Sequence, residues 1–176
     1  MTRVASQPIC LVGLRCVGKT TLGRRLAERL SIPFVDLDQE LEPASESTVG
    51  RSAGELLEAL GQEAFRKLES TCLERVLNQG GPRIVATGGG VVLSKANRER
   101  LRAQSRCLWL SAPAALLVTR AELDPAARPA LSFDSPLTEL ENQSLERADL
   151  YAEVSEARFE TDCDPERVLA EMIAYL

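Results

Sequence analysis

The sequence contains no histidine among its 176 residues. This absence excludes Ser-His-Asp hydrolysis, histidine-ligated metal centres and imidazole acid–base chemistry. Any proton transfer must therefore use a carboxylate, a lysine, a tyrosine or a cysteine.

Aromatic residues and excess positive charge are also scarce. Aromatic side chains make up 4% of the chain, and the formal net charge at pH 7 is −5. Proteins that bind nucleic acids usually carry a basic surface, and single-strand binders add aromatic stacking platforms. We therefore expect no nucleic-acid partner. No stretch of the sequence is long and apolar enough to span a membrane, so we expect no membrane partner. We further expect a cytoplasmic protein and a monomer.

Cysteine is present without a pairing pattern. The five cysteines are an odd number, and no two of them stand in a C-x-x-C spacing. This pattern argues against a disulfide framework and against a zinc ribbon. Reduced thiols in a cytosolic protein are the simpler interpretation.

The order of apolar and amphipathic segments predicts the fold class. A chain of this length suits one domain, here residues 1–176. Helical patterns, including 19–30 and one that follows Asp164-Pro165 to the end of the chain, alternate with continuous apolar runs. Such alternation predicts an α/β three-layer sandwich with a parallel central sheet. The runs that we interpret as strands are 9–12, 34–36, 84–87, 107–110 and 158–161.

Two segments break this alternation. Residues 52–78 carry two helical patterns divided near Gly61, with no strand between them, which predicts a helical insertion at about 39–79. Residues 121–136 contain three prolines and little periodicity, which predicts an exposed, mobile loop.

One motif carries a specific chemical prediction. The segment Gly13–Thr20 reads G-L-R-C-V-G-K-T and matches G-x-x-x-x-G-K-[ST] between a predicted strand and a predicted helix. In such loops the backbone N–H groups surround phosphates, the lysine contacts the terminal phosphates and the threonine hydroxyl coordinates Mg²⁺. We therefore expect ATP and Mg²⁺ as cofactors. The predicted nucleotide-binding residues here are Gly13, Arg15, Cys16, Val17, Gly18, Lys19 and Thr20.

Two carboxylates follow the predicted strand at 34–36. Ligands of open parallel sheets bind beyond the carboxyl ends of the strands, where Asp36 and Asp38 stand. One of them can hold the Mg²⁺ hydration shell while the other accepts the proton of an acceptor hydroxyl. A solvated turn or a helix N-cap is the structural alternative.

Further candidates lie later in the chain. Arg66 and Glu69 stand at i, i+3 on a helical face, either as an ordinary surface pair or as an arginine fixed toward a substrate carboxylate. Three consecutive glycines at 88–90 follow a predicted strand, which favours close approach of a ligand to bare backbone over a plain tight turn. Arg128 lies in the proline-containing loop, where it can close over phosphates.

The ordered set of motifs resembles the shikimate kinase family from about residue 9 to residue 151. The set is G-x-x-x-x-G-K-T, D-L-D, F-R-x-L-E, A-T-G-G-G, R-P in the loop, and E-R-A-D-L-Y. The resemblance implies the P-loop kinase fold and ATP-dependent phosphorylation of the 3-hydroxyl of shikimate. It further implies that the helical insertion is a substrate-binding subdomain and that 121–136 is a lid.

The resemblance also implies roles for individual residues. The carboxylate of shikimate would be held by Arg66 and Arg147, and Asp38 would be the base. Thr20 would bind Mg²⁺ directly, and Asp36 would bind it through water. The residues implied to bind shikimate are Asp38, Arg66, Gly89 and Arg147, and the close approach expected at the three glycines adds Gly88 and Gly90 as candidates. Those implied to act on the phosphates are Lys19 and Arg128, with Arg120 on the nucleotide side.

The sequence departs from the family pattern in places. Cys16 stands where a glycine is usual, and a left-handed backbone there would cost on the order of 1 kcal/mol. Cys163 and Asp164 replace a basic residue that is often found near adenine.

The residues favour this function over three alternatives. If the chain were a gluconate kinase, the presence of Arg66, Gly89 and Arg147 together would be unexplained. A ligand-binding module without catalysis would be expected to have lost Lys19, Asp38 or the arginine of the lid. A GTPase is disfavoured because the sequence contains no N-K-x-D motif.

Overall fold

The computed structural model describes residues 6–41, 53–123 and 135–176. Within these ranges five strands alternate with helices, as the sequence predicts. The elements are β1 (Ile9–Val12), α1 (Lys19–Leu30), β2 (Phe34–Asp36), α2 (Ala53–Asn78), β3 (Ile84–Ala86), the short 3₁₀ helix η2 (Val91–Leu93), α3 (Lys95–Gln104), β4 (Arg106–Ser111), α4 (Ala114–Leu123), α5 (Pro136–Val154), β5 (Ala157–Glu160) and α6 (Pro165–Tyr175).

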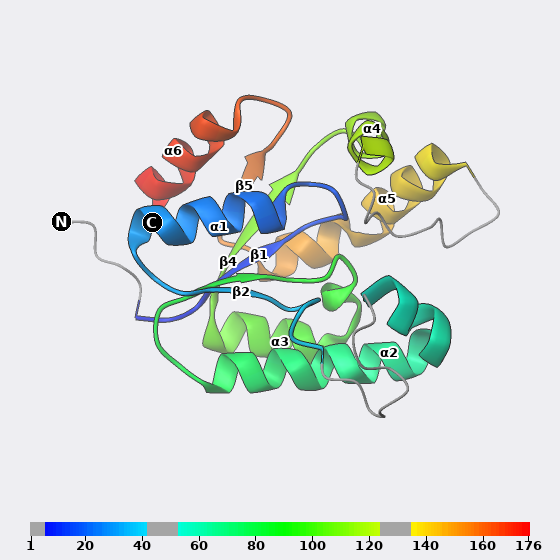
Figure 1. Cartoon of the computed structure of the whole chain (residues 1–176), viewed down its shortest axis with the longest axis horizontal. Helices are drawn as coiled ribbons and strands as arrows, with labels where there is room; N and C mark the ends of the chain where they lie inside the picture. Colours follow the sequence, from blue (N-terminus) through cyan, green and yellow to red (C-terminus); the bar gives the residue numbers. More distant parts are fainter. Residues whose placement is uncertain (1–5, 42–52, 124–134) are drawn as a thin grey trace.

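The strands form one parallel sheet in the order β2-β3-β1-β4-β5. Every residue of the central strand β1 is buried, because helices cover both faces of the sheet. Figure 1 shows α1 and α6 on one face and α2 and α3 on the other. The predicted three-layer α/β architecture is confirmed, with strand boundaries shifted by one residue in β3, β4 and β5.

The parallel order places the loops of the site at one edge of the sheet. The strands β1, β2 and β3 end at Val12, Asp36 and Ala86, directly before the phosphate loop, Asp38 and the three glycines. Because neighbouring parallel strands end at the same edge, these segments meet although they are far apart in the sequence.

The predicted division of the helical insertion is confirmed. Gly61 has φ 76° and ψ 166°, which breaks the helical path of α2 into two parts. The second part packs beside the end of β2, where Arg75 Nη2 donates to the carbonyl oxygen of Glu40 over 2.7 Å. This bond ties the helix that carries Arg66 to the turn that carries Asp38.

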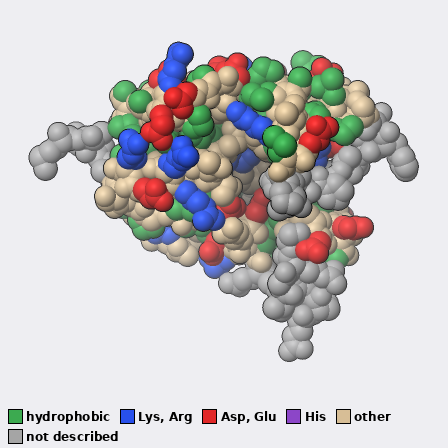
Figure 2. All heavy atoms as spheres, turned by 45° about the horizontal axis from the view of Figure 1, so that its top comes forward, with side chains coloured by type: hydrophobic (Ala, Val, Ile, Leu, Met, Phe, Trp, Pro, Cys, Tyr) green, Lys and Arg blue, Asp and Glu red, His purple; other side chains and the backbone are tan. Residues whose placement is uncertain are grey.

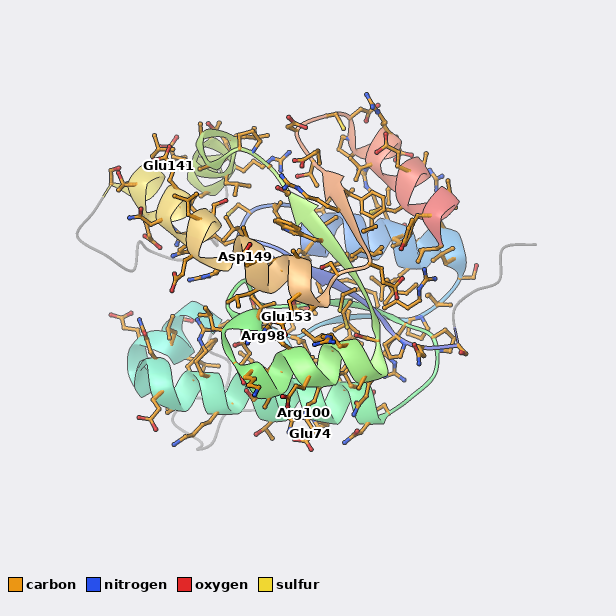
Figure 3. The ribbon with its side chains drawn as sticks, turned by 180° about the vertical axis from the view of Figure 1, so that it is seen from behind. Glu74, Arg98, Arg100, Glu141, Asp149 and Glu153 are labelled. Carbon is orange, nitrogen blue, oxygen red and sulfur yellow. The ribbon has the colours of Figure 1, made fainter. Side chains whose placement is uncertain are left out.

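Ion pairs join α3 to both of its helical neighbours. Arg98 Nε lies 2.7 Å from Glu153 Oε2 of α5, and Arg100 Nη2 lies 2.9 Å from Glu74 Oε2 of α2 (Figure 3). Arg98 Nη1 also donates to the carbonyl oxygen of Val92 over 2.8 Å. Through this hydrogen bond, the helix α3 stabilises the turn that follows the three glycines.

The predicted loop at 121–136 is wrong at both of its ends. Residues 121–123 form the last turn of α4, and Pro136 opens α5. Ser135 is the N-cap of α5, and its Oγ accepts a hydrogen bond from the backbone N–H of Thr138 over 3.2 Å. Proline is favoured at the first helical position because its missing N–H is not needed there. The rest of the predicted loop, 124–134 with Arg128, lies outside the described residues.

The surface carries charge of both signs. On the face shown in Figure 2, acidic and basic side chains are interspersed. Within the described ranges, no helix combines the length and the apolar character needed to cross a membrane.

Candidate active site

The phosphate loop lies between β1 and α1, with a backbone that needs glycine at its ends. Gly13 has φ 142°, and a Cβ added there would lie 2.2 Å from the carbonyl oxygen of Leu110. Gly18 has φ 99° and is the N-cap of α1. The two glycines of the motif are therefore required by the path of the loop and by the closeness of β4.

Cys16 adopts a left-handed backbone conformation, the case for which the sequence predicts an energetic cost. Its φ is 60°, in a region that costs a residue with a Cβ about 1 kcal/mol. The loop therefore carries a small strain at the residue that stands between its two glycines.

The Lys19 side chain folds back over its own loop. Its Nζ donates to the carbonyl oxygens of Gly13 and Leu14, over 2.9 and 2.7 Å. These bonds hold the ammonium group above the loop, where the phosphate oxygens of a bound nucleotide are the expected alternative acceptors.

Thr20 and Asp36 meet beside Lys19. The Thr20 hydroxyl donates to Asp36 Oδ2 over 2.8 Å, and Asp36 Oδ1 accepts from the backbone N–H of Asp38 over 3.1 Å. A hydroxyl and a carboxylate side by side are hard oxygen ligands, which Mg²⁺ prefers. The pair predicted from the sequence to serve Mg²⁺ is therefore brought together, with a donor set that fits this ion.

A cavity of about 490 Å³ opens over the loop. This volume falls within the usual range for small-molecule sites. The predicted residues that line the cavity are Arg15, Cys16, Val17, Gly18, Lys19, Thr20, Asp36, Asp38, Gly89 and Arg120. Cys163 lines it as well, at the segment where the sequence departs from the family pattern that it resembles.

The three glycines make room for side chains of α2. A Cβ on Gly88 would lie 2.4 Å from Glu69 Oε1 and 3.4 Å from Asp38 Oδ1. A Cβ on Gly90 would lie 2.3 to 2.4 Å from three guanidinium atoms of Arg66. The sequence predicts that the glycines leave space for a ligand, and part of that space is filled by the side chains of Glu69 and Arg66.

Arg66 and Arg147 both border this turn. Arg66 Nη1 pairs with Glu69 Oε2 over 2.8 Å, and the Glu69 side chain is only 3% exposed. Arg147 Nη1 donates to the carbonyl oxygen of Gly89 over 3.3 Å. Two arginines 81 positions apart in the sequence therefore converge on one turn, beside Asp38.

Arg15 has a partner that sequence reasoning missed. Its Nη2 lies 3.3 Å from Oε1 of Glu139 in α5, and that carboxylate also accepts from Gln143 Nε2 over 2.7 Å. Glu139 is a buried charge, 5% exposed, and a buried charge requires a partner. No local pattern around Glu139 indicates this contact, because its partner comes from the opposite end of the sequence.

Arg120 connects α4 to the far side of the phosphate loop. Its Nη2 donates to the carbonyl oxygen of Thr161 over 2.5 Å, and its Nη1 donates to the hydroxyl of Thr161 over 3.2 Å. Thr161 Oγ1 in turn donates to the carbonyl oxygen of Val17 over 3.0 Å. Arg120 thus lines the cavity beside the phosphate loop, and Thr161 is a further residue that the sequence did not single out.

A parallel five-stranded sheet with a G-x-x-x-x-G-K-[ST] loop between its first strand and first helix defines a P-loop nucleotide-binding protein. Comparison with known proteins identifies the family. The model of the shikimate kinase family matches residues 15–176, so the chain belongs to the shikimate kinase family, whose members are phosphotransferases.

Individual relatives agree with this assignment. A shikimate kinase of Rhodopseudomonas palustris is 34% identical over 173 residues, which cover 98% of this chain and 82% of the relative. A shikimate kinase of Mesorhizobium japonicum is 38% identical over 168 residues, which cover 96% of this chain and 79% of the relative.

Solved structures show the same relationship. The shikimate kinase of Acinetobacter baumannii in complex with shikimate superposes with a TM-score of 0.84 and is 32% identical, covering 97% of this chain and 92% of that one. A gluconokinase of Sinorhizobium meliloti has a TM-score of 0.67 at 18% identity, with 96% of this chain and 90% of that one covered, and shows that the fold is shared.

Proposed function

We propose that this chain transfers the γ-phosphoryl group of ATP to the 3-hydroxyl of shikimate, giving shikimate 3-phosphate and ADP. The observation that carries this proposal is the convergence of Arg66 and Arg147 on the glycine turn beside Asp38. The proposal is supported by the family of the chain and by a relative whose structure contains shikimate.

The acceptor end of the site suits an anionic ring alcohol. Two guanidinium groups provide charge-assisted, directional hydrogen bonds for a carboxylate, and Glu69 fixes the direction of one of them. Asp38 is then placed to accept the proton of the attacking hydroxyl, as a general base. In this assignment Gly88, Gly89 and Gly90 form the backbone surface against which the acceptor lies.

The nucleotide end stabilises the transferred group. The backbone N–H groups of the phosphate loop and the ammonium of Lys19 oppose the negative charge of the phosphates. We propose that Arg120 lies beside the nucleotide. Arg128, outside the described residues, stays a sequence-based prediction as the arginine that closes over the phosphates.

Mg²⁺ fits the pair of oxygen ligands described above. We propose that Thr20 holds the ion through its hydroxyl and Asp36 through a water molecule. When bound, Mg²⁺ neutralises charge on the phosphates. The contribution of the protein is to hold the Thr20 hydroxyl and the Asp36 carboxylate in contact before the nucleotide arrives.

We propose that the enzyme is a monomer. We propose that it acts in the cytoplasm, whose reducing conditions suit the free thiols of Cys10, Cys107 and Cys163. Light scattering after size exclusion tests the monomer, and a mass equal to twice that of the chain would contradict it.

An ADP-release assay with shikimate, with gluconate and with no acceptor tests the function. We expect shikimate-dependent ADP, with a ³¹P NMR signal for the 3-phosphate, and little signal with gluconate. Turnover with gluconate instead would favour the gluconate kinase. Shikimate binding without ADP release would favour the non-catalytic ligand-binding module. The Lys19→Ala protein is the matched control for contaminating kinases.

A further inference from the structure

Two donors from one helix share the carbonyl oxygen of Gly89. Arg147 Nη1 donates over 3.3 Å and the Tyr151 hydroxyl donates over 2.5 Å, so the tyrosine makes the closer bond. The two residues stand four positions apart on α5 and therefore lie on one face of that helix. The site described above uses Arg147 and gives no role to Tyr151.

The surroundings of Tyr151 fix the direction of its hydroxyl. The residue is 1% exposed, and its ring centroid lies 5.7 Å from that of Trp109 in β4. The guanidinium of Arg158 covers the Trp109 ring, 4.5 Å from its centroid. A ring packed in this way has one available orientation, and that orientation directs the hydroxyl at Gly89.

The hydroxyl remains a donor throughout the neutral range. Burial raises the pKa of Tyr151 to about 12, although the nearby Arg147 acts in the opposite direction. The bond to Gly89 therefore persists at any pH at which the enzyme is assayed.

We infer that Tyr151 is a positioning residue for the acceptor: by satisfying the Gly89 carbonyl, it leaves the Arg147 guanidinium available for the carboxylate of shikimate. This inference rests on the proposed function. When a partly buried carbonyl loses its closer donor, the folded state loses free energy of stabilisation unless another donor replaces it. Arg147 is the donor already within reach, so the loss of the hydroxyl would draw its guanidinium toward the backbone and away from the substrate.

Tyr151→Phe tests the inference because it keeps the ring and removes only the hydroxyl. We expect the KM for shikimate to rise roughly tenfold, as for the loss of one hydrogen bond to a charged group, with kcat and the KM for ATP changed less than about twofold. Tyr175→Phe is the matched control. Its ring packs edge-on against Phe159 at 6.0 Å, on α6, and neither KM should change.

A second variant tests the route through Arg147. If Tyr151 acts through this arginine, adding Tyr151→Phe to Arg147→Ala should weaken shikimate binding no further, as measured by calorimetry. Fully additive losses would overturn the inference. So would an unchanged KM for shikimate in Tyr151→Phe, or equal shifts in Tyr151→Phe and Tyr175→Phe. Absence of shikimate-dependent ADP release by the unaltered enzyme would instead overturn the proposed function, so the two failures are distinguishable.

Discussion

A single methyl group at Gly90 should displace the Arg66 guanidinium. The Cβ of Gly90→Ala would lie 2.3 to 2.4 Å from Nη2, Cζ and Nη1 of Arg66. Ordinary contacts between such atoms begin near 3.5 Å, so the guanidinium must move by roughly 1 Å. The backbone at Gly90 has φ −97° and ψ 2°, which alanine can adopt, and the displaced atoms are the end of a flexible side chain. The fold should therefore tolerate the change.

The expected loss lies in substrate binding. A hydrogen bond to a charged group contributes about 1.5 to 3 kcal/mol when its partner is lost. We therefore expect the Kd for shikimate, measured by calorimetry, to rise roughly 10- to 100-fold, with the Kd for ATP and the Tm almost unchanged.

Gly80→Ala is the control variant, because it should change stability and leave shikimate binding unchanged. Gly80 has φ 62° and no atom within 4 Å of an added Cβ, so alanine there adds backbone strain without touching the site. It should lower the free energy of unfolding by about 1 kcal/mol and leave the Kd for shikimate unchanged. An unchanged Kd for shikimate in Gly90→Ala, or an equal loss of ATP affinity, would refute the placement of Arg66 in the acceptor site.

Four further changes give distinct expectations. Lys19→Ala should remove most turnover in the ADP-release assay while the Tm stays close to that of the original chain, and normal turnover would contradict the role of the loop. Asp38→Asn should lower kcat roughly 10²-fold or more, and near-normal kcat would reduce Asp38 to a hydroxyl-positioning residue. In urea denaturation, Cys16→Gly should raise the free energy of unfolding by up to about 1 kcal/mol, whereas Cys16→Ala should bring no such gain because alanine keeps the strained φ. The raised pKa of Tyr151 means that the unfolded state loses its proton first, so the free energy of unfolding should fall between about pH 10 and 12, and Tyr151→Phe should reduce that fall.

Local patterns in the sequence were sufficient for the five strands and for the helices α1, α2 and α6. The apolar runs and the phosphate loop predicted β1, α1 and β2 with the bounds that the structure shows. Gly61 marked the break in α2 correctly, because a glycine between two amphipathic patterns is a local signal. The end of the predicted loop at 136 was wrong because Pro136 was interpreted as a loop residue, although the first helical turn also favours proline.

The residues of the candidate site likewise fall into those that a local pattern identifies and those that it does not. The residues proposed to bind through a local motif, such as Lys19 and Thr20, are recognisable from their spacing alone, because one loop supplies all of their geometry. The proposed roles of Arg66 and Arg147 came from resemblance to a family, since nothing local to either residue distinguishes it from surface charge.

Only the tertiary structure decided which distant groups meet. The parallel order of the sheet brings the ends of β1, β2 and β3 to one edge, and α5 then crosses this edge with Glu139 and Tyr151 facing the loops. The ion pair of Glu139 with Arg15 and the hydrogen bond of Tyr151 to Gly89 join residues 124 and 62 positions apart. Such contacts depend on chain packing rather than on local propensity. The sequence by itself therefore determined the strands, part of the helices and the phosphate loop, whereas packing determined the surroundings of the proposed acceptor site.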